Sequence, residues 1–338
     1  MDRQDHICFN AQDRSYFSIL KKEIHKIVAE AGFSATKVGE IDIIVAEMTS
    51  NLVKHAEGGE ILVRLMMDGD AEAIELISID NGPGMTDPQK MMEDGLSTSS
   101  TLGHGLGSMK RLSDVFQIYS LKEWGTIILS RVYRKTPPAN RVPPRAEVRS
   151  VIVAKPGESV SGDSYCYELT TEKLTLFVGD GLGHGPDAND AVTQAVKAIR
   201  KENTGEPVDM LRSLHTSVRK TRGLVGTIAV FNFKDKKWRI CGIGNIATRM
   251  QNGLLVRNYM SYNGIIGMNI PNTMKDQIVD HVKGQLIIMC SDGIKTRWDT
   301  QRYTAIFRYD LAILAAAIYK DYGRRTDDMS VVIARINN

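Results

Sequence analysis

A helix-like run at residues 36–55 places three polar side chains at intervals of four residues. Glu47, Asn51 and His55 therefore share one face of the predicted helix, beside its apolar stripe. The amide oxygen of Asn51 suits Mg²⁺, a hard cation that bridges phosphates, and Glu47 could accept a proton from an attacking hydroxyl group. Taken alone, this spacing is more typical of a solvated helix face, so its meaning depends on the segments that follow.

Two glycine-rich segments provide that context. Asp80 ends the strand-like run AIELISID and precedes NGPGM, which contains Gly82 and Gly84. A carboxylate there can accept a hydrogen bond from an exocyclic amine, and the glycines allow the backbone to approach a flat base. The segment GHGLG at residues 103–107 precedes a predicted helix near Ser108, whose free N–H groups and dipole favour phosphate. Three such elements in this order predict a nucleotide site.

Four aspartates in the second half each lie beside a predicted strand end. They are Asp163, Asp180, Asp292 and Asp328, in the segments SGDSYCY, LFVGDGLGHG, IIMCSDGI and DDMSVVIARI. Strand ends on one side of a sandwich converge, so distant carboxylates can share two metal ions about 3.5–4 Å apart and activate a water molecule. Oxygen ligands favour Mg²⁺ or Mn²⁺ over zinc. One Asp-Gly pair is first a turn signal, but four such acids predict a metal site that hydrolyses phosphoesters.

The bulk composition excludes several classes of protein. A chain of 338 residues suits two domains, and it has no apolar stretch long enough to span a bilayer. Its start lacks a secretory signal, and its 4 cysteines show no disulfide or zinc spacing. We therefore expect a cytoplasmic protein that does not bind membranes. The basic residues are scattered rather than gathered with aromatic residues, so nucleic-acid binding is not predicted.

The proline-rich segment TPPANRVPPR predicts a short, stiff linker between two domains. The predicted boundaries are 1–135 for the first domain, 136–147 for the linker and 148–338 for the second domain. Hydrophobic periodicity predicts helices, strands and a mixed sheet in the first domain, and many short strands with two helices in the second. The predicted helices span 15–31, 36–55, 185–202 and 207–220, with a short one near Ser108. The predicted strands lie at 60–67, 73–80, 115–120, 125–133, 148–154, 174–179, 227–233, 238–242, 286–290 and 329–336. The expected class is α+β.

The motifs of the first half resemble the GHKL ATP-binding superfamily, whose fold is the Bergerat α/β sandwich with a mixed sheet. EMTSNLVKHA is similar to its N-box, DNGPGM to its first glycine box, and GHGLGSMKRL to its lid glycine box. The resemblance is closest to anti-sigma-factor-type switch serine/threonine kinases and covers nearly all of residues 1–134. Sensor histidine kinases fit less well because residues 1–35 are too short for a dimerisation hairpin. Gyrase-like ATPases fit less well because no transducer-like domain follows.

The resemblance implies a role for each matched residue. Glu47 would be the base, Asn51 would carry Mg²⁺, Asp80 would bind adenine beside Gly82 and Gly84, and Thr126 would support the adenine pocket. The lid glycines Gly103, Gly105 and Gly107 would contact the phosphates of ATP. Members of this family phosphorylate a Ser or Thr of a small STAS-domain antagonist, and a sigma factor or another switch protein is a further candidate partner. Whether the domain forms a homodimer, as relatives often do, stays open.

The second half resembles the metal-dependent PPM serine/threonine phosphatases, in the SpoIIE-like subgroup, over residues 148–338, with a β-sandwich flanked by helices. The resemblance implies an Mn²⁺ or Mg²⁺ pair bridged by Asp180. The Gly181 carbonyl would ligate one metal, while Asp292 and Asp328 would complete the other. Asp163 takes the place of the acid of a GGD motif that here reads SGD. Many relatives have a His directly after the Asp-Gly pair, where this chain has Leu182, and the nearest histidine is His184. The general acid stays open.

Two complete sites on one chain predict a bifunctional kinase and phosphatase that sets the phosphorylation state of a STAS-domain antagonist in bacterial partner switching. One alternative is a binding module that uses ATP to sequester a partner or sigma factor. Another is a phosphatase regulated by the nucleotide. Retention of Glu47 favours catalysis over binding alone.

Overall fold

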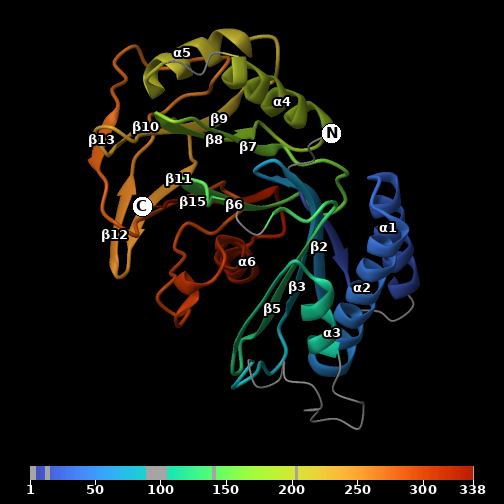
Figure 1. Cartoon of the computed structure of the whole chain (residues 1–338). Coiled ribbons are helices and arrows are strands. Elements are labelled where there is room, and N and C mark those ends of the chain that lie inside the picture. Colours follow the sequence, from blue (N-terminus) through green and yellow to red (C-terminus); the bar gives the residue numbers. More distant parts are fainter. Residues whose placement is uncertain (1–4, 12–15, 89–104, 139–141, 202–204, 338) are drawn as a thin grey trace. The chain divides into compact units, whose positions relative to one another are not determined.

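The computed structural model describes residues 5–11, 16–88, 105–138, 142–201 and 205–337. Its internal contacts divide the chain into two compact units (Figure 1). Unit 1 comprises residues 1–143 and 305–316, and unit 2 comprises residues 144–304 and 317–338. A short stretch from the C-terminal half of the chain therefore belongs to unit 1, which nothing in the sequence analysis predicted. Within the described residues, no helix is long and apolar enough to cross a membrane.

Unit 1 contains a five-stranded sheet with helices on one face (Figure 1). In sheet order, the strands are β1 (Ile7–Asn10), β2 (Gly59–Asp68), β3 (Ala71–Asp80), β5 (Gly125–Tyr133) and β4 (Val115–Leu121). The helices are α1 (Phe17–Glu30), α2 (Ala35–Ala56) and α3 (Gly105–Leu112). Every helix and strand predicted for this region is present, and only β1 was not predicted.

The strand pairing corrects one prediction. All the strand pairs of this sheet are antiparallel among the described residues, so the predicted mixed sheet is wrong for the part of the chain that is described. The reason is the length of the connections: two residues separate β2 from β3, and three separate β4 from β5. Connections that short can join only antiparallel neighbours, because a parallel pair needs a crossover of a dozen or more residues.

The core of unit 1 follows the two periodicities of its elements. Ile41, Ile44 and Met48 of α2 are buried at helical spacing, as predicted, and pack with alternate residues of the strands, including Ile74 and Leu76. Successive side chains of a strand point to opposite faces, so the residue between Ile74 and Leu76 must lie on the other face of the sheet. That residue is a glutamate.

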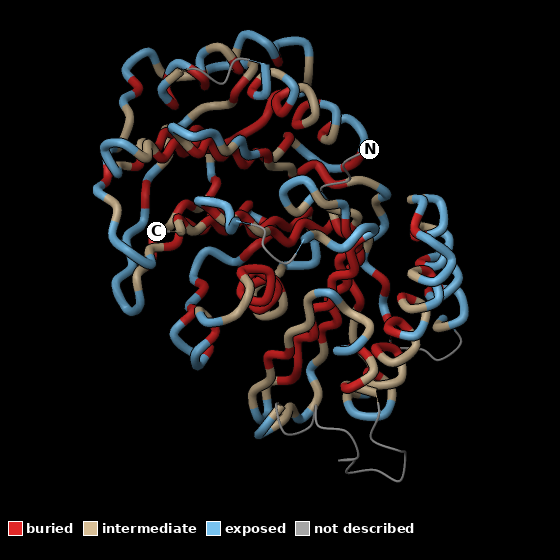
Figure 2. Tube along the Cα trace, in the orientation of Figure 1, coloured by how far each residue is buried: buried red, intermediate tan, exposed pale blue. Residues whose placement is uncertain are grey.

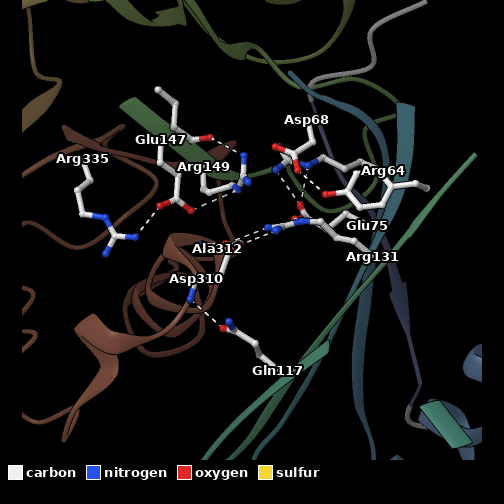
Figure 3. Close-up of polar contacts among 12 residues, drawn as sticks. Arg64, Asp68, Glu75, Gln117, Arg131, Glu147, Arg149, Asp310, Ala312 and Arg335 are labelled. Atoms are coloured by element: carbon white, nitrogen blue, oxygen red, sulfur yellow. Dashed lines mark hydrogen bonds and ion pairs between the residues drawn. The ribbon is translucent and has the colours of Figure 1, made fainter. Parts of the chain in front are cut away.

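Glu75 is fully buried in a network of charged groups (Figure 3). Its Oε1 accepts a hydrogen bond from Arg64 Nε at 2.8 Å, and its Oε2 accepts one from Arg131 Nε at 2.6 Å. Burial alone would raise the pKa of Glu75, but the positive charges of Arg64 and Arg131 outweigh burial and hold that pKa well below its usual range. The Glu75 carboxylate is therefore ionised, and its negative charge offsets the positive charges of Arg64 and Arg131. His6 Nε2 also lies 3.3 Å from Glu75 Oε1.

We expect Glu75→Gln to destabilise unit 1 strongly. The substitution leaves two buried guanidinium groups with one fewer negative charge, a change that typically costs about 3–5 kcal/mol. Thermal unfolding followed by far-UV circular dichroism measures it. Glu72→Gln is the matched control, because Glu72 lies on the same strand in an exposed ion pair with Arg134, and exposed pairs contribute about 0–1 kcal/mol. Equal melting temperatures for the two variants would contradict the role assigned to Glu75.

Unit 2 contains two five-stranded antiparallel sheets. The first, in sheet order, contains β13 (Gln277–Asp280), β10 (Lys237–Ile243), β9 (Leu224–Asn232), β8 (Lys173–Gly181) and β7 (Asp163–Leu169). The second contains β12 (Leu255–Tyr259), β11 (Ala247–Asn252), β14 (Leu286–Cys290), β15 (Met329–Ile336) and β6 (Ala146–Val153). β11 and β12 form a hairpin whose two-residue turn is Gly253 and Leu254, between the paired residues Asn252 and Leu255.

The two sheets pack face to face around one apolar core. Leu176, Phe231 and Trp238 of the first sheet cluster there with Ile287 and Val332 of the second. Helices α4 (Pro186–Lys201) and α5 (Pro207–Ser217) cover the outer face of the first sheet (Figure 1). The trace is buried along the centres of these sheets and exposed along the outward sides of the helices (Figure 2). A β-sandwich flanked by helices is therefore confirmed.

One helix escaped the sequence analysis. A short 3-10 helix, η3 (Ile306–Arg308), precedes α6 (Leu311–Tyr322). Every residue from Leu311 to Tyr319 is buried. A helix that is apolar on all sides has no amphipathic period, so the periodicity that revealed the other helices gives no signal here.

Candidate functional sites

The adenine end of the predicted nucleotide site lies where β3 ends and β5 begins. Asp80 Oδ1 accepts hydrogen bonds from the backbone N–H of Gly82 at 2.8 Å and of Thr126 at 3.1 Å. The hydroxyl group of Ser120 lies 3.0 Å from that of Thr126 and accepts a hydrogen bond from the Met85 N–H at 2.8 Å. The structure thus brings Asp80, Gly82 and Thr126 together. The sequence analysis missed Ser120, because a lone serine in a strand carries no signal.

The two glycines of this segment permit close backbone packing. Gly84 has φ +71°, and a Cβ atom on it would lie 1.9 Å from the carbonyl oxygen of Leu121. A Cβ on Gly82 would lie 2.8 Å from the carbonyl oxygen of His55 at the end of α2. Any larger residue would push the segment away from α2 and β4. These glycines therefore fix the position of Asp80 relative to the helix that carries Glu47 and Asn51.

The phosphate end of the predicted site lies between α2 and the start of α3. A Cβ on Gly105, the first residue of α3, would lie 2.7 Å from Glu47 Oε2 and 4.0 Å from Asn51 Oδ1. Glu47, Asn51 and Gly105 therefore converge, and the free N–H groups of the α3 N-terminus lie in the same region. Gly107 is buried within α3. Gly103 lies outside the described residues.

In unit 2, the sheet register brings the first two aspartates together. Asp163 and Asp180 are direct partners across the β7–β8 pair. Asp163 is buried, and its Oδ2 accepts a hydrogen bond from the Ser291 hydroxyl group at 2.6 Å. Ser291 directly precedes Asp292, so this bond ties Asp163 to the loop after β14. Sequence reasoning missed Ser291, although its position beside Asp292 was a usable signal.

Asp328 and Asp292 flank the adjacent strands β15 and β14. Both carboxylate oxygens of Asp328 accept backbone N–H groups, from Lys155 at 2.8 Å and from Gly162 at 2.9 Å. Asp292 is exposed, and its Oδ2 accepts a hydrogen bond from the side-chain amide of Asn245 at 2.9 Å. The backbone N–H of Gly181 donates to the Gly162 carbonyl at 2.9 Å, which joins the end of β8, beside Asp180, to the residue before Asp163 of β7.

These carboxyl groups disturb one another electrostatically. Burial, followed by repulsion from Asp163 and Asp292, raises the pKa of Asp180 to about 10. Burial also raises the pKa of Asp163 to about 8, against the lowering effect of its hydrogen bond from Ser291. Burial raises the pKa of Asp328 as well, although its two backbone hydrogen bonds oppose the change. Several acids that destabilise one another's ionised forms are typical of a site built for a compensating cation.

The donor chemistry of this site fits a hard divalent cation. Asp163 Oδ1 is buried and has no hydrogen-bond partner among the described residues, although buried polar atoms are nearly always paired. Its oxygens and those of Asp180 and Asp328 are the ligand type that Mg²⁺ and Mn²⁺ prefer. Within the described ranges, no group of three or more His, Cys, Asp or Glu side chains is arranged closely enough to hold a metal ion. The ligand assignments for Asp163, Asp180, Gly181, Asp292 and Asp328 stay predictions.

We expect Asp163→Asn to stabilise the protein when a chelator has removed metal ions. The folded protein raises the pKa of Asp163 to about 8, so ionised Asp163 opposes folding. This destabilisation grows as pH rises from the unfolded pKa of about 3.9 to the folded value. The stabilisation by Asn should therefore be absent near pH 4 and reach roughly 1–3 kcal/mol above pH 8. Urea unfolding at several pH values measures the difference in the free energy of unfolding. Asp190→Asn, at an exposed position of α4, is the control. A pH-independent difference would contradict the mechanism.

His184 is held in place near the acidic cluster. Its Nδ1 lies 2.6 Å from Glu158 Oε1, and its positive charge, when present, lowers the pKa of Asp328. Its side chain is 46% exposed. The sequence analysis named His184 but not Glu158, which is 26 residues away in sequence.

Two parts of the chain match families of known proteins. Residues 10–131 match the Histidine kinase-like ATPase domain, and residues 170–337 match Stage II sporulation protein E (SpoIIE). The serine/threonine-protein kinase RsbT of Bacillus subtilis (strain 168) is 36% identical over 102 residues, which cover 30% of this chain and 77% of RsbT. The chain is a histidine kinase-like ATPase domain joined to a SpoIIE-like phosphatase domain. It belongs to the GHKL family over its first part and to the PPM family over its second.

Further relatives support the second part. The phosphoserine phosphatase RsbX of Bacillus subtilis (strain 168) is 25% identical over 148 residues, which cover 41% of this chain and 70% of RsbX. A structure from work on the bacterial stressosome is 30% identical with a TM-score of 0.53, and the match covers 56% of this chain and 99% of that one. RsbX in complex with magnesium has a TM-score of 0.51 at 17% identity, over 58% of this chain and 98% of RsbX, and so supports the fold alone. The chain is therefore an enzyme of the serine/threonine phosphatase class that also carries a kinase-family domain.

Proposed function

We propose that the chain both phosphorylates and dephosphorylates a serine or threonine of a STAS-domain antagonist in a partner-switching pathway. The observation that carries the proposal is the presence, on one chain, of two separate sets of converging residues. Glu47, Asn51 and Gly105 converge in unit 1, and Asp163 and Asp180 are paired in unit 2. Similarity to RsbT over the first part and to RsbX over the second supports the pairing of opposed activities.

In the kinase reaction, the hydroxyl oxygen of the partner attacks the γ-phosphorus of ATP, and ADP leaves. Glu47 would accept the hydroxyl proton, and the Asp80 carboxylate, which the Gly82 and Thr126 N–H groups orient, would bind the adenine amine. Asn51 would hold Mg²⁺, and the N-terminus of α3 would contact the phosphates. Positioning and electrostatics supply most of the rate in such transfers, because little covalent chemistry falls to the protein.

In the phosphatase reaction, a water oxygen attacks the phosphorus and the bond to the serine or threonine oxygen breaks. An Mn²⁺ or Mg²⁺ pair, when bound, would lower the pKa of that water. Asp180 and Asp163 would hold the pair from β8 and β7, while Asp292, Asp328 and the Gly181 carbonyl would complete it. Ser291 and Asn245 orient two of these carboxylates through the hydrogen bonds described above.

The proposal is tested with the purified chain, a purified STAS-domain protein from the same genome, and ATP with Mg²⁺. Phosphate should move from ATP to one hydroxyl group of the partner. After ATP is removed and Mn²⁺ is added, the same chain should release that phosphate. Intact-mass spectrometry follows both steps. A partner that gains no phosphate over many equivalents of ATP would contradict the kinase half of the proposal.

A further inference from the structure

The segment from the C-terminal half that belongs to unit 1 is fixed there by Asp310. The carboxylate of Asp310 accepts two hydrogen bonds from Arg131, from Nη1 at 2.5 Å and from Nη2 at 2.9 Å (Figure 3). The Asp310 N–H donates to Gln117 Oε1 at 2.8 Å, and the Tyr309 ring contacts the Tyr119 ring edge-on with centroids 5.2 Å apart. Planar double contacts of this kind fix geometry as well as charge.

Asp310 also balances the charge of a buried network. Arg64 and Arg131 bring two positive charges, and Glu75 brings one negative charge to the same buried face. The carboxylate of Asp310 adds a negative charge beside Arg131, and the buried His6 ring lies 3.3 Å from the Glu75 carboxylate in the same network. Removing one member of such a network leaves an uncompensated buried charge, which is strongly unfavourable. Arg131 is therefore held between Glu75 of β3 and Asp310 of the C-terminal segment that belongs to unit 1.

The same network lies on the strands that lead to the nucleotide site. Glu75 is on β3, which ends at Asp80, and Arg131 is on β5, which begins at Gly125 and includes Thr126. The Thr126 N–H donates to the Asp80 carboxylate. A change in the spacing of β3 and β5 on nucleotide binding would therefore reach Arg131 and its contact with Asp310.

The other end of α6 is bonded to the phosphatase loop. In unit 2, the Lys295 N–H donates to the Tyr322 carbonyl at 2.9 Å, and the Arg324 N–H donates to the Gly293 carbonyl at 2.8 Å. Gly293 directly follows Asp292, and a Cβ on it would lie 1.8 Å from the Asp328 carbonyl oxygen. The C-terminal end of α6 is therefore hydrogen-bonded to the loop that follows Asp292. That loop approaches the backbone of Asp328 at Gly293.

We propose that α6 is a coupling helix, through which nucleotide bound at the Asp80 site changes the phosphatase activity. Asp310, immediately before its first residue, docks on the kinase sheet, and its last turn is bonded to the loop that follows Asp292. A packed helix with both ends fixed passes a displacement from one end to the other, because protein interiors are close-packed. The inference rests on the proposed function, since it needs a nucleotide site and a phosphatase site.

The test compares the full-length chain with its Asp310→Asn variant. Hydrolysis of p-nitrophenyl phosphate with Mn²⁺ is measured with and without a non-hydrolysable ATP analogue. The wild-type rate should change at least about fivefold, the lower end of common allosteric effects, whereas the variant rate should change less than about twofold. Hydrogen exchange without Mn²⁺ is the second readout. The analogue should alter exchange in residues 286–296 and 317–328 of the wild type but not of Asp310→Asn.

The controls separate this inference from the function beneath it. Glu72→Gln, an exposed acid on β3, should keep the wild-type response. If Asp310→Asn does not fold, Gln117→Ala is the substitute test variant. It removes one hydrogen bond to Asp310 without leaving a buried charge, so it should fold and should show a weaker response to the analogue. Failure of the analogue to bind, or absence of hydrolysis, would overturn the proposed function. If the analogue binds and the protein hydrolyses p-nitrophenyl phosphate, but the analogue changes neither the hydrolysis rate nor the hydrogen exchange of the wild type, the coupling alone is overturned.

Discussion

Glu47→Ala is expected to lower phosphate transfer from ATP to the STAS-domain partner by about 10²–10⁴-fold, the contribution typical of a positioned general base. Glu47 lies beside Gly105 at the start of α3 and one helical turn from Asn51. Its loss removes the proton acceptor but leaves the Asp80 end of the site intact. The variant should therefore bind ATP with nearly wild-type affinity. Transfer is measured by radiolabelled phosphate in the partner, and binding by calorimetry.

Two further measurements decide whether Glu47 acts in chemistry. Glu23→Ala, which changes an exposed acid on α1, should transfer phosphate at the wild-type rate. Dephosphorylation of the phosphorylated partner by Glu47→Ala should also be unchanged, because that reaction uses the aspartates of unit 2. If Glu47→Ala transfers phosphate normally, the nucleotide domain needs no base at this position and the sequestering role becomes the better account.

Asp180→Asn is expected to lower release of phosphate from the partner by about a hundredfold or more, because a shared metal pair supplies several kcal/mol of transition-state stabilisation. Asp180 is the group whose pKa rises to about 10 through burial and repulsion from Asp163 and Asp292. Asparagine removes the charge that should bridge the metals. Stabilisation by Mn²⁺, measured as a shift in melting temperature, should shrink together with the rate.

The matched control for Asp180→Asn is Asp190→Asn, which changes an exposed residue of α4. This control should keep the wild-type phosphatase rate and the wild-type shift in melting temperature with Mn²⁺. Phosphate transfer from ATP should survive in Asp180→Asn. A variant that loses both activities would indicate general damage to the fold. A variant that keeps full phosphatase activity would show that the converging aspartates serve another purpose.

The sequence was sufficient to propose candidate site residues that lie within short local patterns. Gly-rich turns, a helix with Glu47 and Asn51 on one face, and Asp-Gly pairs after apolar strands are patterns within short windows. The structure brings Asp80 close to Thr126, and Asp163 close to Asp180, because each pair lies at the ends of two strands that are hydrogen-bonded to each other. Strand ends are easy to recognise in a sequence, so residues that follow them can be assigned together.

Contacts made far apart in sequence could not be predicted. The partner of Arg131 is Asp310, 179 residues away, and neither residue lies in a recognisable motif. The helix that follows Asp310 is apolar on all sides and so shows no period. The mixed sheet was predicted from the order of helix-like and strand-like segments, whereas the short connections between β2 and β3 and between β4 and β5 indicate antiparallel pairing directly.

The most direct test of the account is to ask whether both activities act on the same hydroxyl group. The partner is phosphorylated by Asp180→Asn with ATP, mapped by fragmentation mass spectrometry, and then given to Glu47→Ala with Mn²⁺. The account predicts one phosphorylated serine or threonine that the second variant returns fully to the free hydroxyl. Phosphate that stays on that residue while Glu47→Ala hydrolyses p-nitrophenyl phosphate would contradict the claim that this chain writes and removes a single mark.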